Sequence, residues 1–143
     1  PAAQLAALRK GMAAKPRKPI DTAAVDLLAF HVKAQRLPTP DREYRFAAMA
    51  VGGTGAGVKE RLRKARLRDW RFDFAWPDQM VALEMDGGGF VGGRHGTGPG
   101  IEKDCEKYSN AAAMGWRLLR VTPRQGKSGQ AVDWIGKALE IRS

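Results

Sequence analysis

The stretch RFDFAWPDQMVALEMD, residues 71–86, decides the fold because it has the pattern of two β-strands joined by a tight turn. Apolar side chains occupy every second position in both halves, as in strands that bury one face. Pro77 and Asp78 favour a turn between the halves, so the stretch is predicted to form an antiparallel hairpin. The expected buried face consists of Trp70, Phe72, Phe74, Trp76, Val81, Leu83 and Met85.

Three acids interrupt these two strands, and a carboxylate in a sheet is unfavourable unless a cation meets it. Asp73 lies in the first strand and Glu84 and Asp86 in the second. The alternation of side chains predicts that Asp73 and Glu84 project from the same polar face. Converging carboxylates suit a hard divalent cation, since Mg²⁺ takes oxygen ligands and retains several waters. The hairpin therefore predicts a site for Mg²⁺, or for Mn²⁺ in its place.

The segments around the hairpin predict an α/β fold in which helices cover the faces of a mixed sheet. Before the hairpin we expect a short helix with Leu5, Leu8 and Met12, a helix from Asp21 or Thr22 onward with Val25, Leu28 and Val32 on one face, and a strand at 43–46. After it we expect a helix at 101–115, a strand at 116–122 and a last helix with Ala131, Trp134, Ile135, Ala138 and Leu139. In the helix at 101–115 the expected buried stripe is Ile101, Cys105, Tyr108 and Ala112, beside a stripe of Asp104, Lys107 and Ala111.

Two features between the strand at 43–46 and the hairpin allow more than one interpretation. The glycine-rich VGGTGAGVKE, residues 51–60, lacks the Gly-Lys-Ser/Thr of a Walker phosphate-binding loop, so a flexible hairpin tip is expected. The run KERLRKARLR, residues 59–68, has six cations spread along its length. It is either an exposed arm or a strand or helix that contacts DNA.

Length and composition indicate one compact domain, with N-terminal helices and a basic linker at 1–40 and the core at 41–143. Twenty-five Lys and Arg against 15 Asp and Glu give a formal charge of +10, which favours a polyanionic partner such as nucleic acid over a basic surface without a partner. The single cysteine, Cys105, excludes an internal disulfide and fits a reducing cytoplasm. No apolar stretch approaches the ~20 residues that cross a bilayer, so no membrane association is expected.

Taken in order, RFDFAW, ALEMDGG, GRH, DCEKYSNAAAMGW and RLLRVT resemble the motifs of the PD-(D/E)XK nuclease superfamily. The similarity is to the small branch related to very-short-patch-repair endonucleases and phage Holliday-junction-resolvase-like proteins. It covers residues 43–122, where Asp73 and Glu84 are separated by ten residues. The resemblance implies a restriction-endonuclease-like core, a metal held by Asp73 and Glu84, and Asp86 completing the site or orienting a water.

The chain departs from the superfamily pattern where a lysine normally follows the second acid, because Asp86 stands there. The cation that polarises the nucleophilic water or the scissile phosphate must then come from elsewhere. Lys107, three residues after Asp104, is the first candidate, and His95 in the glycine-rich loop at 87–100 is the second. The alternatives are an ordinary exposed lysine and a solvated loop histidine. Glu43 matches the place where the superfamily often supplies a further acid, and the alternative is a surface ion pair.

The resemblance implies a metal-dependent DNA endonuclease that hydrolyses phosphodiester bonds, with branched DNA or a Holliday junction as substrate. A mismatch- or strand-nicking enzyme and a non-catalytic nucleic-acid-binding or assembly protein remain as alternatives. Phosphates near the site would be neutralised by Arg68, Arg71, Arg94 and Lys103. A junction-resolving enzyme would act as a two-fold homodimer and a nicking relative as a monomer, and the residues do not decide between them.

Overall fold

A computed structural model describes residues 21–86 and 98–140 of the chain, and the helix expected around Leu5 lies outside this range. The elements are α2 (Thr22–Ala34), β1 (Asp41–Tyr44), α3 (Phe46–Ala50), α4 (Val58–Lys64), β2 (Phe72–Trp76), a 3-10 turn η1 (Pro77–Gln79), β3 (Val81–Met85), α5 (Gly98–Ala113), β4 (Arg117–Val121), α6 (Pro123–Ser128) and α7 (Gln130–Glu140). Among these, no helix combines the length and the apolar character that crossing a membrane requires.

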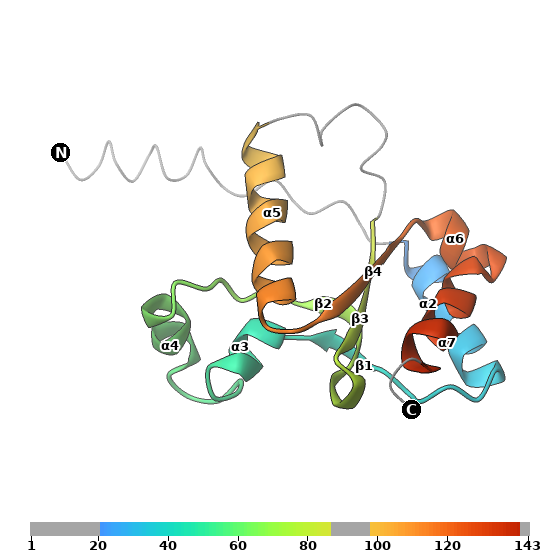
Figure 1. Cartoon of the computed structure of the whole chain (residues 1–143), viewed down its shortest axis with the longest axis horizontal. Helices are drawn as coiled ribbons and strands as arrows, with labels where there is room; N and C mark the ends of the chain where they lie inside the picture. The colour runs from blue at the N-terminus through green and yellow to red at the C-terminus, as the bar shows by residue number, and fades with distance from the viewer. Residues whose placement is uncertain (1–20, 87–97, 141–143) are drawn as a thin grey trace.

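The strands form a single mixed sheet in the order β1-β2-β3-β4. The β1–β2 and β2–β3 pairs are antiparallel. The β3–β4 pair is parallel, because α5 crosses over between these two strands. In Figure 1, α2, α6 and α7 lie on one side of the sheet, and α3, α4 and α5 lie on the other. The predicted α/β fold with helices on both sheet faces is therefore confirmed.

The predicted hairpin of β2 and β3 is also confirmed. Phe74 pairs with Leu83 and Trp76 with Val81, and η1 with Met80 closes the turn. Met80 has a φ of +54°, so the left-handed residue of this turn is a methionine and not a glycine. The Met80 carbonyl accepts a bond from the Arg117 N–H at 2.8 Å, which joins the turn to the start of β4.

Two hydrophobic clusters hold the helices to the two sheet faces. The first joins α2 and α7 to alternate residues of the strands and includes Leu28, Val32, Phe74, Trp76, Val81, Leu83, Met85, Val121 and Ile135. The second joins α3, α4 and α5 to the opposite face and consists of Phe46, Ala47, Leu62, Phe72, Ala75, Ala82, Ala111 and Trp116. Helices thus pack on both faces, and β2 and β3 are the most buried strands, whereas most of β1 is exposed.

Phe72 departs from the predicted alternation, because it packs in the second cluster while Phe74 packs in the first. The cause lies on the neighbouring strand, where Glu43 has a φ of +50° and interrupts the regular alternation of side chains. Arg42, just before Glu43, stacks over the Phe74 ring on the side of the first cluster. Tyr44, just after Glu43, contacts Trp116 on the side of the second cluster. Phe72 consequently stacks on the Phe46 ring, with centroids 4.0 Å apart.

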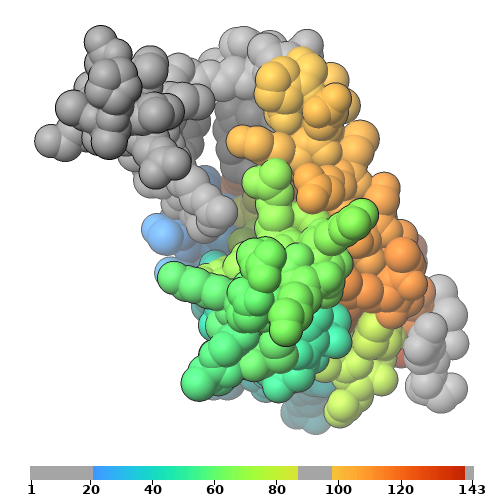
Figure 2. Space-filling view, turned by 90° about the vertical axis from the view of Figure 1, so that its left-hand side faces the viewer, coloured from blue at the N-terminus to red at the C-terminus, as the bar shows by residue number. Residues whose placement is uncertain are grey.

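The glycine-rich stretch at 51–60 does not form the expected hairpin tip between strands, because it joins two helices. The expected strand at 43–46 ends at Tyr44, and α3 begins at Phe46. Residues 58–64 of the cationic run form the helix α4, while its contact with DNA stays a prediction. Figure 2 faces α3 and α4, whose green and teal atoms form a projecting part of the surface beside α5.

The stripe of α5 that faces the protein is also different from the expected one. Ile101 is 46% exposed and Cys105 is exposed, whereas Ala111 of the neighbouring stripe is buried. Lys107, from the same stripe as Ala111, is directed to the sheet, where Glu84 accepts its hydrogen bond. The rule that apolar side chains mark the buried face fails here because the sheet presents acids to this helix.

The end of the chain contains a helix that the periodicity of apolar residues does not reveal. Thr122 accepts a bond from the Gln125 N–H, and the Gln125 side chain accepts one from the Thr122 N–H, which is a capping box that starts α6. The predicted last helix is confirmed as α7, which buries Ile135 and Leu139 against the first cluster.

The orientation of α5 can be tested by truncating one side chain from its outer face. We expect Ile101→Ala to change the free energy of unfolding by no more than about 0.5 kcal/mol, as for most exposed positions. Phe72→Ala, at a fully buried position, serves as the matched comparison and should cost about 3–5 kcal/mol. Urea denaturation measures both, and a loss of 2 kcal/mol or more for Ile101→Ala would contradict the observed helix orientation.

Candidate active site

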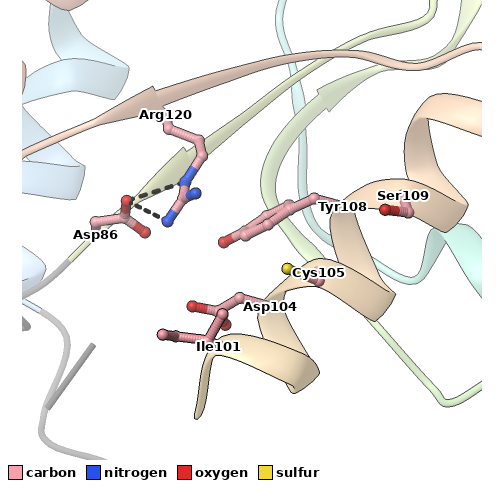
Figure 3. A pocket seen from close by; sticks show the side chains of 7 residues that line it. All are labelled: Asp86, Ile101, Asp104, Cys105, Tyr108, Ser109 and Arg120. Atoms are coloured by element: carbon pink, nitrogen blue, oxygen red, sulfur yellow. Dashed lines mark hydrogen bonds and ion pairs between the residues drawn. The ribbon is translucent and has the colours of Figure 1, made fainter. Parts of the chain in front are cut away.

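An open hollow of about 490 Å³ lies where α5 faces the ends of β3 and β4 (Figure 3). It is lined by Asp86, Ile101, Asp104, Cys105, Tyr108, Ser109 and Arg120. The Arg120 guanidinium binds the Asp86 carboxylate at 2.9 Å and lies over the Tyr108 ring, 4.2 Å from its centroid. Asp86 is therefore neutralised by a cation from β4.

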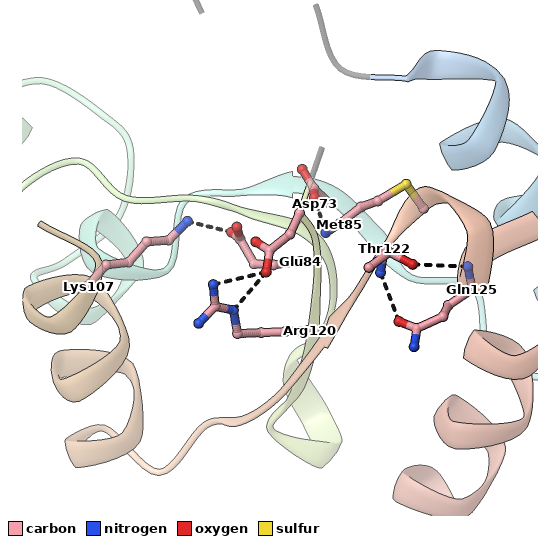
Figure 4. A network of polar contacts seen from close by, with 8 residues as sticks. Asp73, Glu84, Met85, Lys107, Arg120, Thr122 and Gln125 are labelled. Carbon is pink, nitrogen blue, oxygen red and sulfur yellow. Dashed lines mark hydrogen bonds and ion pairs between the residues drawn. The ribbon is translucent and has the colours of Figure 1, made fainter. Parts of the chain in front are cut away.

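Next to this hollow, Asp73 and Glu84 lie on adjacent strands. The register that pairs Phe74 with Leu83 places Asp73 opposite Glu84, one step further along the ladder. Asp73 accepts a hydrogen bond from the Met85 N–H at 2.7 Å, so one of its oxygens takes the place of a backbone acceptor (Figure 4). The sequence prediction that these two acids are neighbours agrees with this geometry.

Lys107 of α5 forms an ion pair with Glu84, and Figure 4 shows its ammonium group directed at the Glu84 carboxylate. Both side chains are mostly buried, with 18% of Lys107 and 14% of Glu84 exposed. A lysine normally keeps its ammonium group in water, and burial is favourable only where an acid pairs with it. The arrangement therefore identifies Lys107 as the cation of the acidic site.

The electrostatics of the site raise the pKa values of both acids. Burial raises the pKa of Glu84 to about 7, even though Lys107 lowers it, and the charges of Asp73 and Asp86 raise it further. Burial also raises the pKa of Asp73, against the Met85 N–H bond and Lys107, which lower it. The charges of Lys107 and Asp86 act on the pKa of both Asp73 and Glu84, as expected for groups that lie close together.

These residues fit a divalent cation that keeps most of its waters. Among the residues that the structure describes, no three His, Cys, Asp or Glu side chains are close enough to enclose a metal. Mg²⁺ is commonly bound by only one or two carboxylates together with waters and substrate phosphate oxygens. Asp73 and Glu84 can supply that number, and a dication would offset both the burial of the Glu84 carboxylate and its repulsion by Asp73 and Asp86.

The other predicted site residues lie further out. Glu43 lies opposite Asp73 in the β1–β2 register, but its side chain is exposed and lines a separate shallow hollow with Arg42, Tyr44 and Arg45. Arg68 pairs with Glu106 of α5 at 3.6 Å. Exposed cations also include Arg71 and Lys103. His95 and Arg94 lie outside the described residues.

Two residues of the site were not among the predicted ones. Arg120 binds Asp86 and lies over the Tyr108 ring. Burial and the nearby charge of Glu84 raise the pKa of the Tyr108 hydroxyl. The predicted strand WRLLRVT does contain a signal for Arg120. Side chains alternate along a strand, so Arg120 is a cation on the same face as the apolar Leu118. Tyr108 was assigned to a buried apolar stripe, and its hydroxyl gave no separate signal.

No protein-family model, no curated protein and no solved structure matches this chain. The function must therefore be inferred from the residues and their geometry.

The raised pKa of Glu84 predicts how stability depends on pH. Because the folded protein holds this proton up to about pH 7 and the unfolded chain releases it near 4.5, stability should fall as pH rises from 4.5 to 7. The loss should be on the order of 2 kcal/mol for the metal-free protein. Urea denaturation at about pH 5 and pH 7.5 in chelator measures it.

Glu84→Gln is the matched variant, because glutamine keeps the shape of the side chain and does not titrate. The pH dependence should become markedly smaller in this variant. Equal pH dependence in both proteins would show that Glu84 ionises in the fold as it does in water.

Proposed function

We propose that this protein is a metal-dependent DNA endonuclease with a restriction-endonuclease-like core, in which Asp73 and Glu84 bind Mg²⁺ or Mn²⁺ and Lys107 supplies the active-site cation. Branched DNA, such as a Holliday junction, is the substrate that the sequence resemblance implies. The observation that supports the proposal best is the contact of Lys107 with Glu84. In this contact the second acid, on β3, meets a lysine that comes from α5 and not from the same strand.

The order of the elements supports the same assignment. The RFDFAW motif lies on β2, ALEMD on β3, DCEKYSNAAAMG on α5 and RLLRV on β4. The resemblance implies that these motifs form a strand, a strand, a helix and a strand in this order. The corresponding elements are β2, β3, α5 and β4. Asp86 occupies the position of the usual lysine and is paired with Arg120, so a second cation from β4 compensates for the acid.

A bound metal would lower the pKa of a water molecule and stabilise negative charge on the phosphate. Asp73 and Glu84 would hold it between the ends of β2 and β3. Lys107, which contacts Glu84, would stabilise the charge that develops on a phosphate oxygen. Tyr108 and Arg120 hold Asp86 beside this position, and exposed Arg71 and Lys103 are placed to contact neighbouring phosphates.

Removing either acid tests the metal site. We expect Glu84→Ala and Asp73→Asn to lower the rate of DNA cleavage at least about 1,000-fold, because metal assistance is worth several kcal/mol. Asn at 73 can still accept the Met85 bond, so this variant should stay folded. Cleavage is measured with branched, duplex and single-stranded DNA in Mg²⁺, Mn²⁺ and chelator.

DNA affinity, measured in chelator, is the control for these variants and should stay within a few-fold of wild type. A wild type that binds DNA but shows no metal-dependent cleavage of any substrate would favour the non-catalytic nucleic-acid-binding alternative. Cleavage that persists in both variants would refute the assignment of the two acids.

Replacing Lys107 tests the role of the helix cation. We expect Lys107→Gln to lower the cleavage rate about 100-fold with little effect on DNA affinity, as for the loss of one group that stabilises transition-state charge. Lys137→Gln is the matched control, because Lys137 is an exposed lysine of α7, on the opposite side of the sheet. Single-turnover cleavage with saturating enzyme measures the step, and equal rates for the two variants would exclude a role for Lys107 in it.

A further inference from the structure

We infer that α3, α4 and the turn between them, residues 46–68, form a preorganised platform that binds the phosphate backbone of duplex DNA next to the acidic site. This inference rests on the proposed function for the identity of the polyanion. It assigns to the helical hairpin the sequence-independent part of substrate binding, which the acids and Lys107 cannot supply.

The turn of the platform is held from inside by one arginine. The Arg61 guanidinium donates hydrogen bonds to the carbonyls of Val51, Gly53 and Ala56 at 2.7, 3.0 and 2.8 Å. Gly57, with a φ of +81°, allows this approach, because a Cβ there would lie 3.1 Å from the guanidinium. Arg61 is therefore committed to the turn, and it gives the glycine-rich segment a fixed shape.

Contacts at the base of the platform join it to the sheet. Arg45 forms two hydrogen bonds with the Asp69 carboxylate, at 2.7 and 2.9 Å, and thereby links the start of α3 to the segment after α4. The Phe46 ring stacks on Trp70, with centroids 6.1 Å apart, and Leu62 of α4 is buried in the second cluster. A platform that is ordered before binding loses less conformational entropy when DNA arrives.

The outer surface of the platform presents cations that the fold does not use. Lys59, Lys64 and Arg66 are exposed, and within the described part of the chain they form no ion pair. Arg63, also exposed, is paired with Glu60 of the same helix at the surface. Such pairs are worth little in water, so this arginine can also exchange its partner for a phosphate.

The platform lies beside the helix that supplies Lys107. Arg68, just after α4, is 3.6 Å from Glu106, the residue that precedes Lys107 on α5. Figure 2 shows α4 in front and α5 directly beside it, on the same side of the molecule. A DNA backbone that follows the platform would therefore pass close to the side of α5 that leads to the acids.

Duplex DNA fits this surface better than an acidic protein does. The exposed cations surround a short helix without any large exposed apolar side chain on α4, and protein interfaces usually contain such anchors. Lysine and arginine on a rigid, polar surface are typical of contacts with phosphate. Specificity for the form of the substrate would then depend on the site itself.

The test compares two triple variants with the same change of charge. The first is Lys59→Gln, Lys64→Gln and Arg66→Gln. The second, on the opposite side of the sheet, is Lys33→Gln, Arg36→Gln and Lys137→Gln, and it includes Arg36, which shares the left-handed φ of Arg66. Both are made in the Glu84→Gln background, and affinity for duplex and four-way-junction DNA is measured in chelator by fluorescence anisotropy at several salt concentrations.

We expect the first triple variant to lower affinity at least about tenfold and to reduce the slope of log K against log salt by about two to three, one for each lost phosphate contact. The second should stay within about twofold of the parent protein. Equal effects of the two variants, no effect of the first, or no DNA binding by the parent would overturn the inference. If the first triple variant unfolds, the single variants Lys59→Gln and Lys64→Gln provide the test instead. Each should reduce the slope of log K against log salt by about one.

Cleavage assays separate this inference from the proposed function. Loss of binding by the first variant together with a wild type that never cleaves DNA would refute the endonuclease and leave the platform in place. Normal cleavage by the wild type together with equal binding by both variants would refute the platform alone.

Discussion

The structure depends on how the protein accommodates two carboxylates in one face of a sheet that helices cover on both sides. Asp73 and Glu84 are directed at α5, and an unpaired charge at such a depth would be strongly unfavourable. Lys107 meets this requirement, and it can do so only if α5 turns its polar stripe to the sheet. The apolar Ile101 then lines the open hollow beside the acids and is 46% exposed. The orientation of the helix is thus a consequence of the two acids.

This constraint separates the parts of the fold that can be predicted from those that cannot. The β2–β3 hairpin, α2 and α7 follow from local patterns, because their apolar stripes pack on an apolar sheet face. For α5 the same rule gives the wrong stripe, since the partner surface is charged and the pattern of one segment does not report its partner. The misplacement of Phe72 has a similar origin, because the left-handed Glu43 that reverses the alternation lies on another strand.

The turn between α3 and α4 shows the limit of composition as a guide. Its glycines indicate flexibility when they are read alone, yet Arg61 fixes the turn through three carbonyls. The residues of the acidic site are more accessible to sequence analysis, since the motifs around Asp73, Glu84 and Lys107 point to all three. The pairing of Asp86 with Arg120 is not, because ion pairs between strands distant in sequence depend on the sheet order.

The charges of the site explain why the buried lysine comes from α5 and pairs with Glu84. Three carboxylates, Asp73, Glu84 and Asp86, face two cations, Lys107 and Arg120, so one negative charge is in excess when all groups are ionised. Burial is the main cause of the raised pKa of Glu84, and the charges of Asp73 and Asp86 raise it further. A lysine in place of Asp86 would reverse the balance to one positive charge, and Arg120 would then lack its partner. With Asp86 present, the acids outnumber Lys107 and Arg120, which is the charge balance that the proposed dication would require.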